Sequence, residues 1–344
     1  MFFAHTSATL LFSLGLLGGV VLGANELRIH NISEFIDFSK IINRGMKCSG
    51  TTVYLESDIV FDSSPSQQLK PIGERVILCF QGTFDGQGHT ISNLIINSSS
   101  ECVGFFGSTE GAVIKNVVLD DSCSFTSTHN SSYANLGGIS GWCDPCVIES
   151  IVNMASVTFA GNVSSNFWVG GVAGRFLGSS TIRNCVNYGP ITHSGDTNKQ
   201  ESNLGGIAGM SGKDGDKFIQ NCVNYGTITY NGITTNGLYM GGIVGQSYHG
   251  TINVENCVSA GKIVNLKQAT INNFFGSVVG YIPSRNDQLT TITHCLWTSD
   301  VGYNNIYGYN GAKVTVTNSS LKELNSTTVD ELNEYAEENS TWNK

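Results

Sequence analysis

The sequence predicts an all-β fold, a right-handed parallel β-helix that forms a three-sided solenoid of about eight coils with short helical caps at both ends. A glycine-rich anchor occurs six times, and the final glycines of successive anchors lie 34, 33, 35, 36 and 35 residues apart. Short strand-like segments follow the anchors, and none has the period of a helix. Such a unit cannot bury its apolar side alone, whereas stacked units share one core. Each unit is therefore predicted to form one coil, with like segments stacked in parallel.

The chain divides into four consecutive parts. Residues 1–23 are predicted to be a cleavable signal peptide, with a buried core helix as the alternative. Residues 24–50 form an N-terminal cap whose amphipathic helix begins at Ser33. The repeats predict the β-helix over 51–318. Residues 319–344 contain a capping box and one apolar helical face, which predicts a C-terminal helical cap.

Alternation along each strand sorts the side chains into columns. The six anchors are Cys102–Gly107, Leu136–Gly141, Val169–Gly174, Leu204–Gly209, Met240–Gly245 and Phe275–Gly280. The second segments place an inward column at Ile114, Ile148, Ile182, Ile219, Val254 and Ile292. The third segments place inward residues at Cys123, Val157, Ile191, Ile228 and Ile263, followed two residues later by a partly aromatic ladder of Phe125, Phe159, His193, Tyr230 and Asn265.

Two polar columns lie beside the inward isoleucines. The first is outward and alternates in charge at its start, which fits pairing between neighbouring coils; it holds Lys115, Glu149, Arg183, Gln220, Glu255 and Thr293. The second holds Asn116, Asn184, Asn221 and Asn256, interrupted by Ser150 and His294. We interpret the first as a solvated ladder and the second as amides stacked at a bend, where asparagine tolerates a left-handed backbone. A charge-based site and a polar binding track are the functional alternatives.

Composition excludes several classes of partner. The formal net charge is −9 and charged residues make up only 13% of the chain. Without a cluster of Lys or Arg, we expect no nucleic acid partner. Beyond the predicted signal peptide, no apolar run is long enough to span a membrane. We therefore expect a secreted or cell-surface monomer, without a cofactor, whose partner is an extracellular glycan or protein.

Several motifs resemble those of one known family. The segment GTFDGQGHTISNLII at 82–96, followed by VGFFG, IKNVVL and repeated GG[IV]xG and NCVNYG, resembles the GLUG-motif proteins. The resemblance covers about residues 27–344 and implies an exported right-handed parallel β-helix that serves as an adhesin-like surface module. Some members of the family are attached to a zinc peptidase. None of the seven histidines here lies in a His-Glu-x-x-His motif, so the resemblance does not imply a peptidase.

Ten cysteines in an exported chain indicate disulfides, but most of them fall at inward positions. Stacked side chains on parallel strands stay nearly 4.8 Å apart, farther than the ~3.8 Å between bonded Cβ atoms. The column of Cys185, Cys222, Cys257 and Cys295 is therefore predicted to hold free thiols. Cys143 and Cys146 lie in a loop instead and are predicted to form a local disulfide. We expect no metal site.

Catalytic signals are weak. Asp85 in FDGQGH resembles residues of polysaccharide-cleaving β-helices, but an acid beside two glycines commonly marks a turn. Glycosidases need two carboxylates at a defined separation, and no unit supplies a pair. The run 213–217 is too short for a calcium loop. We therefore assign no catalytic residue, and an enzyme that acts on polysaccharide, as a lyase or glycoside hydrolase, is the alternative.

Aromatic residues at repeated positions indicate binding. Trp168, Tyr239 and Phe274 precede the anchors of three coils at one outward-leaning position, and Tyr188 and Tyr225 match at another bend. Exposed aromatics on a rigid face suit stacking on sugar rings or contact with a protein. The alternative is that they only cover a corner. Sequons, whose number is no higher than composition predicts, offer N-glycosylation at Asn31, Asn97, Asn130, Asn162, Asn318, Asn325 and Asn339.

Overall fold

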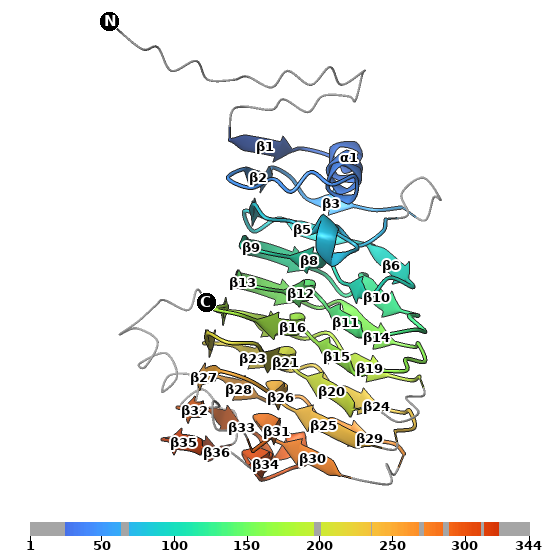
Figure 1. Cartoon of the computed structure of the whole chain (residues 1–344). Helices are drawn as coiled ribbons and strands as arrows, with labels where there is room; N and C mark the ends of the chain where they lie inside the picture. Colours follow the sequence, from blue (N-terminus) through green and yellow to red (C-terminus); the bar gives the residue numbers. More distant parts are fainter. Residues whose placement is uncertain are drawn as a thin grey trace, which may run out of the picture.

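The computed structural model is a right-handed parallel β-helix of about seven turns, slightly fewer than the eight predicted. It describes residues 25–62, 69–195, 201–234, 236–267, 272–284, 289–310 and 313–322. The chain advances coil by coil from the blue N-terminal end to the red C-terminal end (Figure 1). The predicted signal peptide and the predicted C-terminal helix lie outside the described residues. None of the described helices is long and apolar enough to cross a membrane.

Four parallel sheets run along the solenoid. Sheet 1 contains the second segments: β1 (Glu26–Ile29), β2 (Thr52–Leu55), β3 (Ile59–Val60), β4 (Thr83–Asp85), β5 (Thr90–Ser92), β9 (Ala112–Leu119), β13 (Cys146–Asn153), β17 (Thr181–Arg183), β18 (Val186–Asn187), β22 (Asp216–Gln220), β23 (Val223–Asn224), β27 (Thr251–Glu255), β28 (Val258–Ser259), β32 (Leu289–Thr293), β33 (Leu296–Trp297), β35 (Lys313–Thr317) and β36 (Ser320–Leu321). Sheet 2 contains the third segments: β6 (Ile95–Ser98), β10 (Ser124–Ser127), β14 (Ser156–Phe159), β19 (Ile191–His193), β24 (Ile228–Tyr230) and β29 (Ile263–Asn265).

The anchors supply the other two sheets. Sheet 3 consists of β7 (Cys102–Val103), β11 (Ala134–Gly137), β15 (Phe167–Gly170), β20 (Glu201–Gly205), β25 (Gly237–Gly241) and β30 (Asn273–Gly276). Sheet 4 consists of β8 (Phe106–Thr109), β12 (Ser140–Cys143), β16 (Ala173–Leu177), β21 (Ala208–Gly212), β26 (Val244–Ser247), β31 (Val279–Ile282) and β34 (Tyr307–Asn310). The described helices are α1 (Ile32–Asn43) and the 3-10 turns η2 (Val76–Leu78) and η3 (Ser299–Val301).

A glycine corner splits each anchor into two strands, which the sequence does not predict. In one coil β15 ends at Gly170 and β16 begins at Ala173. A Cβ atom on Gly171 would lie 2.3 Å from the carbonyl oxygen of Gly206 in the next coil and 2.4 Å from Cγ of Asn187. Only glycine allows the backbone to approach so closely. The coil therefore has one corner more than a three-sided arrangement of three strands.

Buried amides support this corner from inside. Asn153 donates a hydrogen bond to the carbonyl of Gly171 at 2.9 Å and another to Oδ1 of Asn187 at 2.8 Å. Asn187 in turn donates to Oδ1 of Asn224 at 2.8 Å. All three asparagines are fully buried. The ladder thus pairs the corner carbonyl of Gly171 in the buried interior.

The predicted core columns are present, with one change of register. The inward column of the second segments pairs in register and is fully buried at Ile114, Ile148, Ile182, Ile219, Val254 and Ile292. In sheet 2, Phe125 pairs with Ile96 and Val157, while Phe159 pairs with His193. The alignment of Phe125 with Phe159 is therefore wrong by two residues. Because side chains alternate with a period of two, Phe125 still points into the core.

Helix α1 closes the N-terminal end of the core. Its N-cap is Asn31, whose side chain accepts a hydrogen bond from the first turn. Phe35 and Phe38 are buried on its inner face, and Phe35 stacks on Phe105 at 5.8 Å between ring centroids. Strand β1 already pairs with β2, so the ladder begins at Glu26 rather than after residue 50. The N-terminal cap thus contains the first rung of the solenoid.

Candidate functional site

The aromatic residues that precede the anchors share a column but not the predicted exposure. Trp168, Tyr239 and Phe274 align across sheet 3, with Asn203 between the first two. Trp168 is 3% exposed and Tyr239 is 4% exposed, while Phe274 is half-buried. The prediction that these residues form an exposed face is therefore wrong for Trp168 and Tyr239.

The glycine corner explains this burial. It folds sheets 3 and 4 so that their outward side chains meet, and we call the resulting line of contacts the outer crease. The Tyr239 ring stacks 4.2 Å from Tyr281 of sheet 4, and the Trp168 ring lies 4.3 Å from the guanidinium of Arg175. The outward side chains of the crease cover each other; they include Trp142, Trp168, Arg175, Met210, Tyr239, Phe274 and Tyr281.

Tyr188 and Tyr225 have the exposure that a binding surface needs. They are 50% and 42% exposed, and their rings stack at 5.1 Å and 11° between neighbouring coils. Each follows the Asn-Cys-Val-Asn sequence of its unit, which turns the tyrosine to the outside of the coil. Together they form a flat aromatic pair on the surface of sheet 1.

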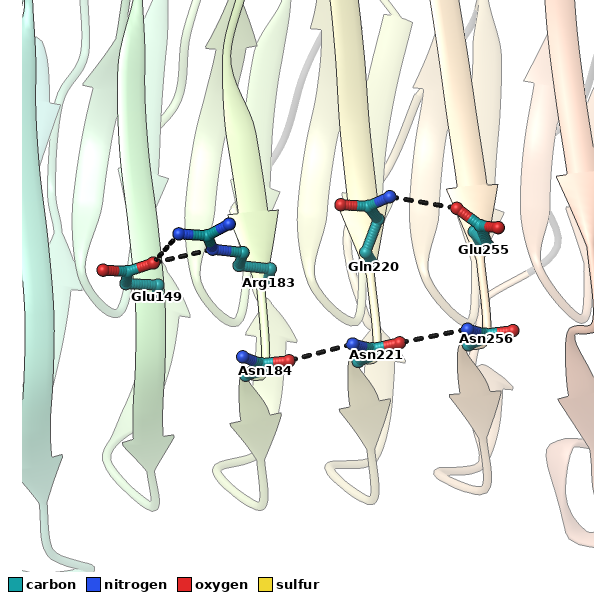
Figure 2. Close-up of a pocket in the computed structure, with 7 residues that line it drawn as sticks. All are labelled: Glu149, Arg183, Asn184, Gln220, Asn221, Glu255 and Asn256. Carbon is teal, nitrogen blue, oxygen red and sulfur yellow. Dashed lines mark hydrogen bonds and ion pairs between the residues drawn. The ribbon is translucent and has the colours of Figure 1, made fainter. Parts of the chain in front are cut away.

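A polar groove of about 470 Å³ lies on the same surface of sheet 1. Figure 2 shows its two rows of side chains, which come from four successive coils. The groove is lined by Glu149, Arg183, Asn184, Gln220, Asn221, Glu255 and Asn256. Asn184 and Tyr188 belong to one coil and Asn221 and Tyr225 to the next, so the tyrosine pair lies beyond the asparagine row along these two coils.

The asparagine row marks the bend in sheet 1. Asn184, Asn221 and Asn256 have φ of 55°, 53° and 50°, as the predicted left-handed bend requires. The Asn221 amide donates to Oδ1 of Asn184 at 3.0 Å, and the Asn256 amide donates to Oδ1 of Asn221 at 3.2 Å. This ladder fixes the amides in one plane and leaves further donor and acceptor positions on them. Ser150 and His294 occupy the same bend with φ of 54° and 49°.

The charged row is paired from coil to coil. Arg183 Nε donates to Glu149 at 2.6 Å, and Gln220 donates to Glu255 at 2.9 Å. Lys115 instead pairs with Asp85 at 3.3 Å. The groove therefore offers carboxylate acceptors, one guanidinium and carboxamides in a regular order. The sequence interpretation treats this column as a solvated ladder and does not anticipate the hollow beside it.

An apolar strip separates the groove from the tyrosines. Val223, Val258 and Leu296 form an outward cluster of their own, with Val186 packed against it. Each valine lies between the asparagine and the tyrosine position of its coil, as Val186 does between Asn184 and Tyr188. Val223, Val258 and Leu296 are largely buried, so each coil passes from charged groups through amides and covered apolar side chains to the tyrosine position. Sequence reasoning misses the strip, although the recurring valine two residues after the asparagine is its signal.

Comparison with known proteins supports the fold. No family model matches the chain, and no curated protein matches it. A solved structure described as a "putative immunoglobulin A1 protease" from Bacteroides ovatus is similar, with a TM-score of 0.60 and 19% sequence identity. The similarity covers 91% of this chain and 87% of that one. At this identity it supports the β-helix architecture alone.

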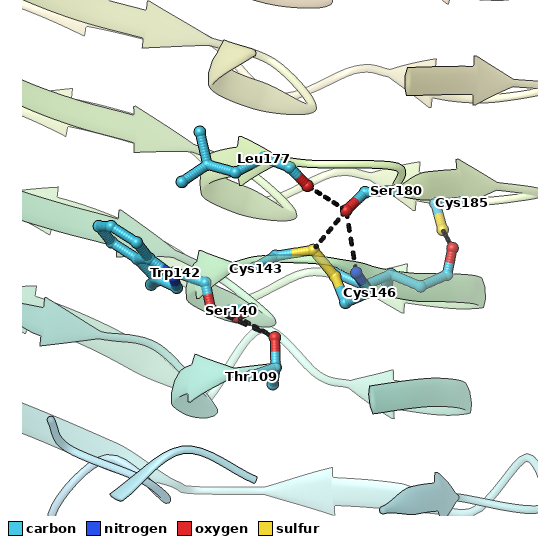
Figure 3. Close-up of a disulfide and its surroundings, with 9 residues drawn as sticks. Thr109, Ser140, Trp142, Cys143, Cys146, Leu177, Ser180 and Cys185 are labelled. Atoms are coloured by element: carbon cyan, nitrogen blue, oxygen red, sulfur yellow. Dashed lines mark hydrogen bonds between the residues drawn. A yellow bond between two sulfur atoms is a disulfide. The ribbon is translucent and has the colours of Figure 1, made fainter. Parts of the chain in front are cut away.

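The structure joins Cys143 and Cys146 in a disulfide at the end of β12 and the start of β13 (Figure 3). Their Cα atoms are 5.5 Å apart. Ser180 from the next coil accepts a hydrogen bond from the Cys146 amide at 2.9 Å, and its hydroxyl contacts Cys143 Sγ at 3.8 Å. The bond therefore lies in a turn that the following coil also holds. This arrangement is a local staple, because strands β12 and β13 flank the disulfide in place of the strand and helix that redox motifs use.

The remaining described cysteines carry free thiols. Cys185, Cys222, Cys257 and Cys295 are fully buried in one column. Burial raises the pKa of the Cys102 and Cys123 thiols to about 12. A buried thiol with a raised pKa is a poor nucleophile, so Cys102 and Cys123 behave as small apolar residues.

Asp85 and the run 213–217, which the sequence offers as possible catalytic or calcium sites, both stabilise local turns. Burial opposes ionisation of Asp85, but hydrogen bonds from Asn116 and the Gln87 amide, together with Lys115, hold the pKa of its carboxyl below the ordinary value. In the run 213–217, the Lys217 ammonium donates to two backbone carbonyls of the loop, each at 2.7 Å. Within the described ranges, no group of three or more His, Cys, Asp or Glu is arranged to hold a metal ion.

Four of the predicted glycosylation acceptors lie on the exposed surface of described segments: Asn97, Asn130, Asn162 and Asn318. Asn31 is also exposed, but its side chain caps α1. Asn325 and Asn339 lie outside the described residues. The use of any of these acceptors stays a prediction.

Proposed function

We propose that this protein is a secreted or surface-displayed, non-catalytic binding module of adhesin-like type that recognises glycans. The observation that carries the proposal is the surface of sheet 1, where the same coils carry the polar groove and, beyond a strip of apolar residues, the exposed pair Tyr188 and Tyr225. The resemblance to GLUG-motif proteins supports the same assignment. A monomer in the extracellular space, without a cofactor, is part of this proposal.

The chemistry of the surface suits sugars. Sugar hydroxyls both donate and accept, and the groove offers acceptors on Glu149 and Glu255, donors on Arg183 and both on the amides. The ring faces of sugars are apolar enough to lie on aromatic rings, which Tyr188 and Tyr225 present. Because equivalent side chains recur at about 4.8 Å along the axis, a polymer with a short repeat can contact several coils.

A test compares variants of the two halves of the surface. The double variant Tyr188→Ala with Tyr225→Ala is expected to weaken binding to the glycans selected on an array by at least tenfold, because the stacking platform is lost. The control Ile95→Ala removes an exposed apolar side chain from sheet 2 and is expected to leave binding unchanged. Titration calorimetry gives the affinities and circular dichroism checks the fold. Unchanged affinity in the double variant, or no glycan bound on the array, contradicts the proposal.

The alternative is a polysaccharide-active enzyme, for which the carboxylates in the groove would be the candidate catalytic residues. Glu149 and Glu255 are three strands apart in sheet 1, hence separated by about 14 Å along the ladder. Glycosidase pairs lie within about 5–9.5 Å of each other, so these two do not fit that chemistry. Incubation of the protein with the glycans that it binds, followed by analysis of chain length, is expected to show no cleavage. Cleavage that Glu149→Gln abolishes would make the enzyme assignment correct.

A further inference from the structure

A guanidinium is held between aromatic rings in the outer crease. The Arg175 guanidinium carbon lies 4.7 Å from the ring centroid of Trp142 and 4.3 Å from that of Trp168. The ring of Tyr133, which is 46% exposed, stacks on Trp168 at 5.7 Å. Cation–π contacts of this kind fix the position of a guanidinium without using its N–H groups.

Arg175 has no acidic partner. No hydrogen bond or ion pair joins it to another residue of the described segments, although it is partly exposed and the chain is acidic. Its Nε is buried without a partner. The carboxylates of Glu101 and Asp144 act on it only through space, and Asp144 pairs with Lys213 at 2.8 Å. By contrast, Arg28 and Arg183 both pair with glutamates.

Further polar atoms beside this guanidinium also lack partners. Trp168 Nε1 and Oδ1 of Asn135 and Asn203 are buried without a hydrogen bond. Asn135, Trp168 and Asn203 occupy one outward column in three successive coils. Buried polar atoms are almost always paired, and Asn135, Trp168 and Asn203 each leave one such atom unpaired in this column. The crease thus combines an unpaired cation, unused donors and acceptors, and ring faces.

We propose that this part of the crease, formed by Arg175, Trp142, Trp168 and Tyr133, is a second binding site and that it takes a sugar bearing a carboxylate. The planar guanidinium matches a carboxylate with two parallel N–H bonds, and the exposed ring of Tyr133 accepts the apolar face of the sugar, while Trp142 and Trp168 hold the guanidinium in place. Acidic peptides are commonly recognised by clusters of Arg, whereas here one free guanidinium lies between two indole rings. The site is separate from the polar groove and does not depend on it.

Glucuronate and glucose are a matched pair of probes, because they differ in one carboxylate. Titration calorimetry and tryptophan fluorescence of the full chain are expected to show at least tenfold tighter binding of glucuronate. Arg175→Met is expected to abolish this preference, and Arg175→Lys to retain only part of it, because lysine keeps the charge but loses the planar fork. The control Arg28→Met removes an arginine that also lies over a ring, Tyr54, and is expected to change nothing.

Three outcomes overturn the proposal. The first is a preference for glucuronate that survives in both Arg175 variants with circular dichroism like that of the wild type. The second is loss of the preference in Arg183→Met, which would place acidic sugars in the polar groove. The third is binding of glutamate or an acidic peptide as tight as that of glucuronate, which would show recognition without the sugar ring. The double variant of Tyr188 and Tyr225 is expected to keep glucuronate binding, so failure of this site and failure of the proposed function are distinguishable.

Discussion

At the scale of single residues, His193 shows how strongly the solenoid core constrains a titratable group. It is fully buried, and both of its ring nitrogens lack a hydrogen-bond partner. Its ring stacks on Phe159, Phe167 and Tyr230 at 5.4, 4.4 and 4.7 Å. Burial lowers the pKa of His193 to about 3, because the charged form would lose its hydration. The imidazole is therefore neutral in the folded protein throughout the physiological range.

This depressed pKa predicts a loss of stability in acid. Below pH 6.5 the unfolded chain binds a proton at His193 that the folded chain excludes. The contribution of neutral His193 to the free energy of unfolding is fully present above pH 6.5. Below that pH it falls by up to about 1.4 kcal/mol for each pH unit, down to about pH 3. Urea unfolding at pH 7 and pH 5 is expected to show a smaller difference in His193→Phe than in the wild type. Equal differences would mean that the ring is hydrated or paired.

Residue positions divide into those that the sequence predicts and those that it does not. The inward column through Ile148 and Ile182 is predicted correctly because β-branched residues recur at one position of every unit. The exposure of Trp168 is predicted wrongly, because outward direction implies exposure only when the neighbouring sheet turns away. The buried ladder of Asn153 and Asn187 is missed as well, since its role depends on corner carbonyls that come from another segment.

At the scale of elements, the corner between sheets 3 and 4 determines where a ligand can bind. It buries Trp168 and Tyr239 in the crease, and it leaves two places accessible: the bend of sheet 1, and the part of the crease where Arg175 lies near the exposed ring of Tyr133. The sequence contains this corner as a repeated Gly-Gly, but strand propensity alone does not distinguish a glycine inside a strand from one between two strands. For the candidate site, the sequence therefore identifies Tyr188 and Tyr225 and the polar columns, while the groove between coils emerges only from their stacking.

The corner glycines are expected to resist even the smallest substitution. In Gly171→Ala the new Cβ atom would overlap the backbone of the next coil, with 2.3 Å to the Gly206 oxygen, so the stacking must shift. We expect a loss of at least about 3 kcal/mol in the free energy of unfolding. The control Gly111→Ala meets no atom within 4 Å and suffers only from its φ of 64°, which costs about 1 kcal/mol. Urea titrations measure both, and equal losses would contradict the steric role of the corner.

At the scale of the whole molecule, stability depends on contacts between adjacent coils. Each sheet pairs a coil with its two neighbours, so the described solenoid behaves as a one-dimensional array. Its N-terminal end is closed by α1, whose Phe35 and Phe38 continue the core. At the other end, Val316 of β35 and Leu321 of β36 are exposed. The first and the last described coils therefore differ in how far their apolar side chains are buried.

This asymmetry predicts where the solenoid opens and how strongly a core defect acts. Ile219 lies in a central coil and is fully buried, so Ile219→Ala is expected to cost about 2–5 kcal/mol and to lower the protection of amides on both sides of it. Val314→Ala, in the last described coil, removes a partly exposed side chain and is expected to cost less than about 1.5 kcal/mol and to affect β34–β36 alone.

Hydrogen exchange of the wild type is expected to be faster in β36 than in β2, since local opening begins where few apolar groups are buried. Exchange in β36 as slow as in β2 would contradict this order of opening. Equal losses of stability in the two variants would show that the solenoid unfolds as a single unit rather than from its last described coil.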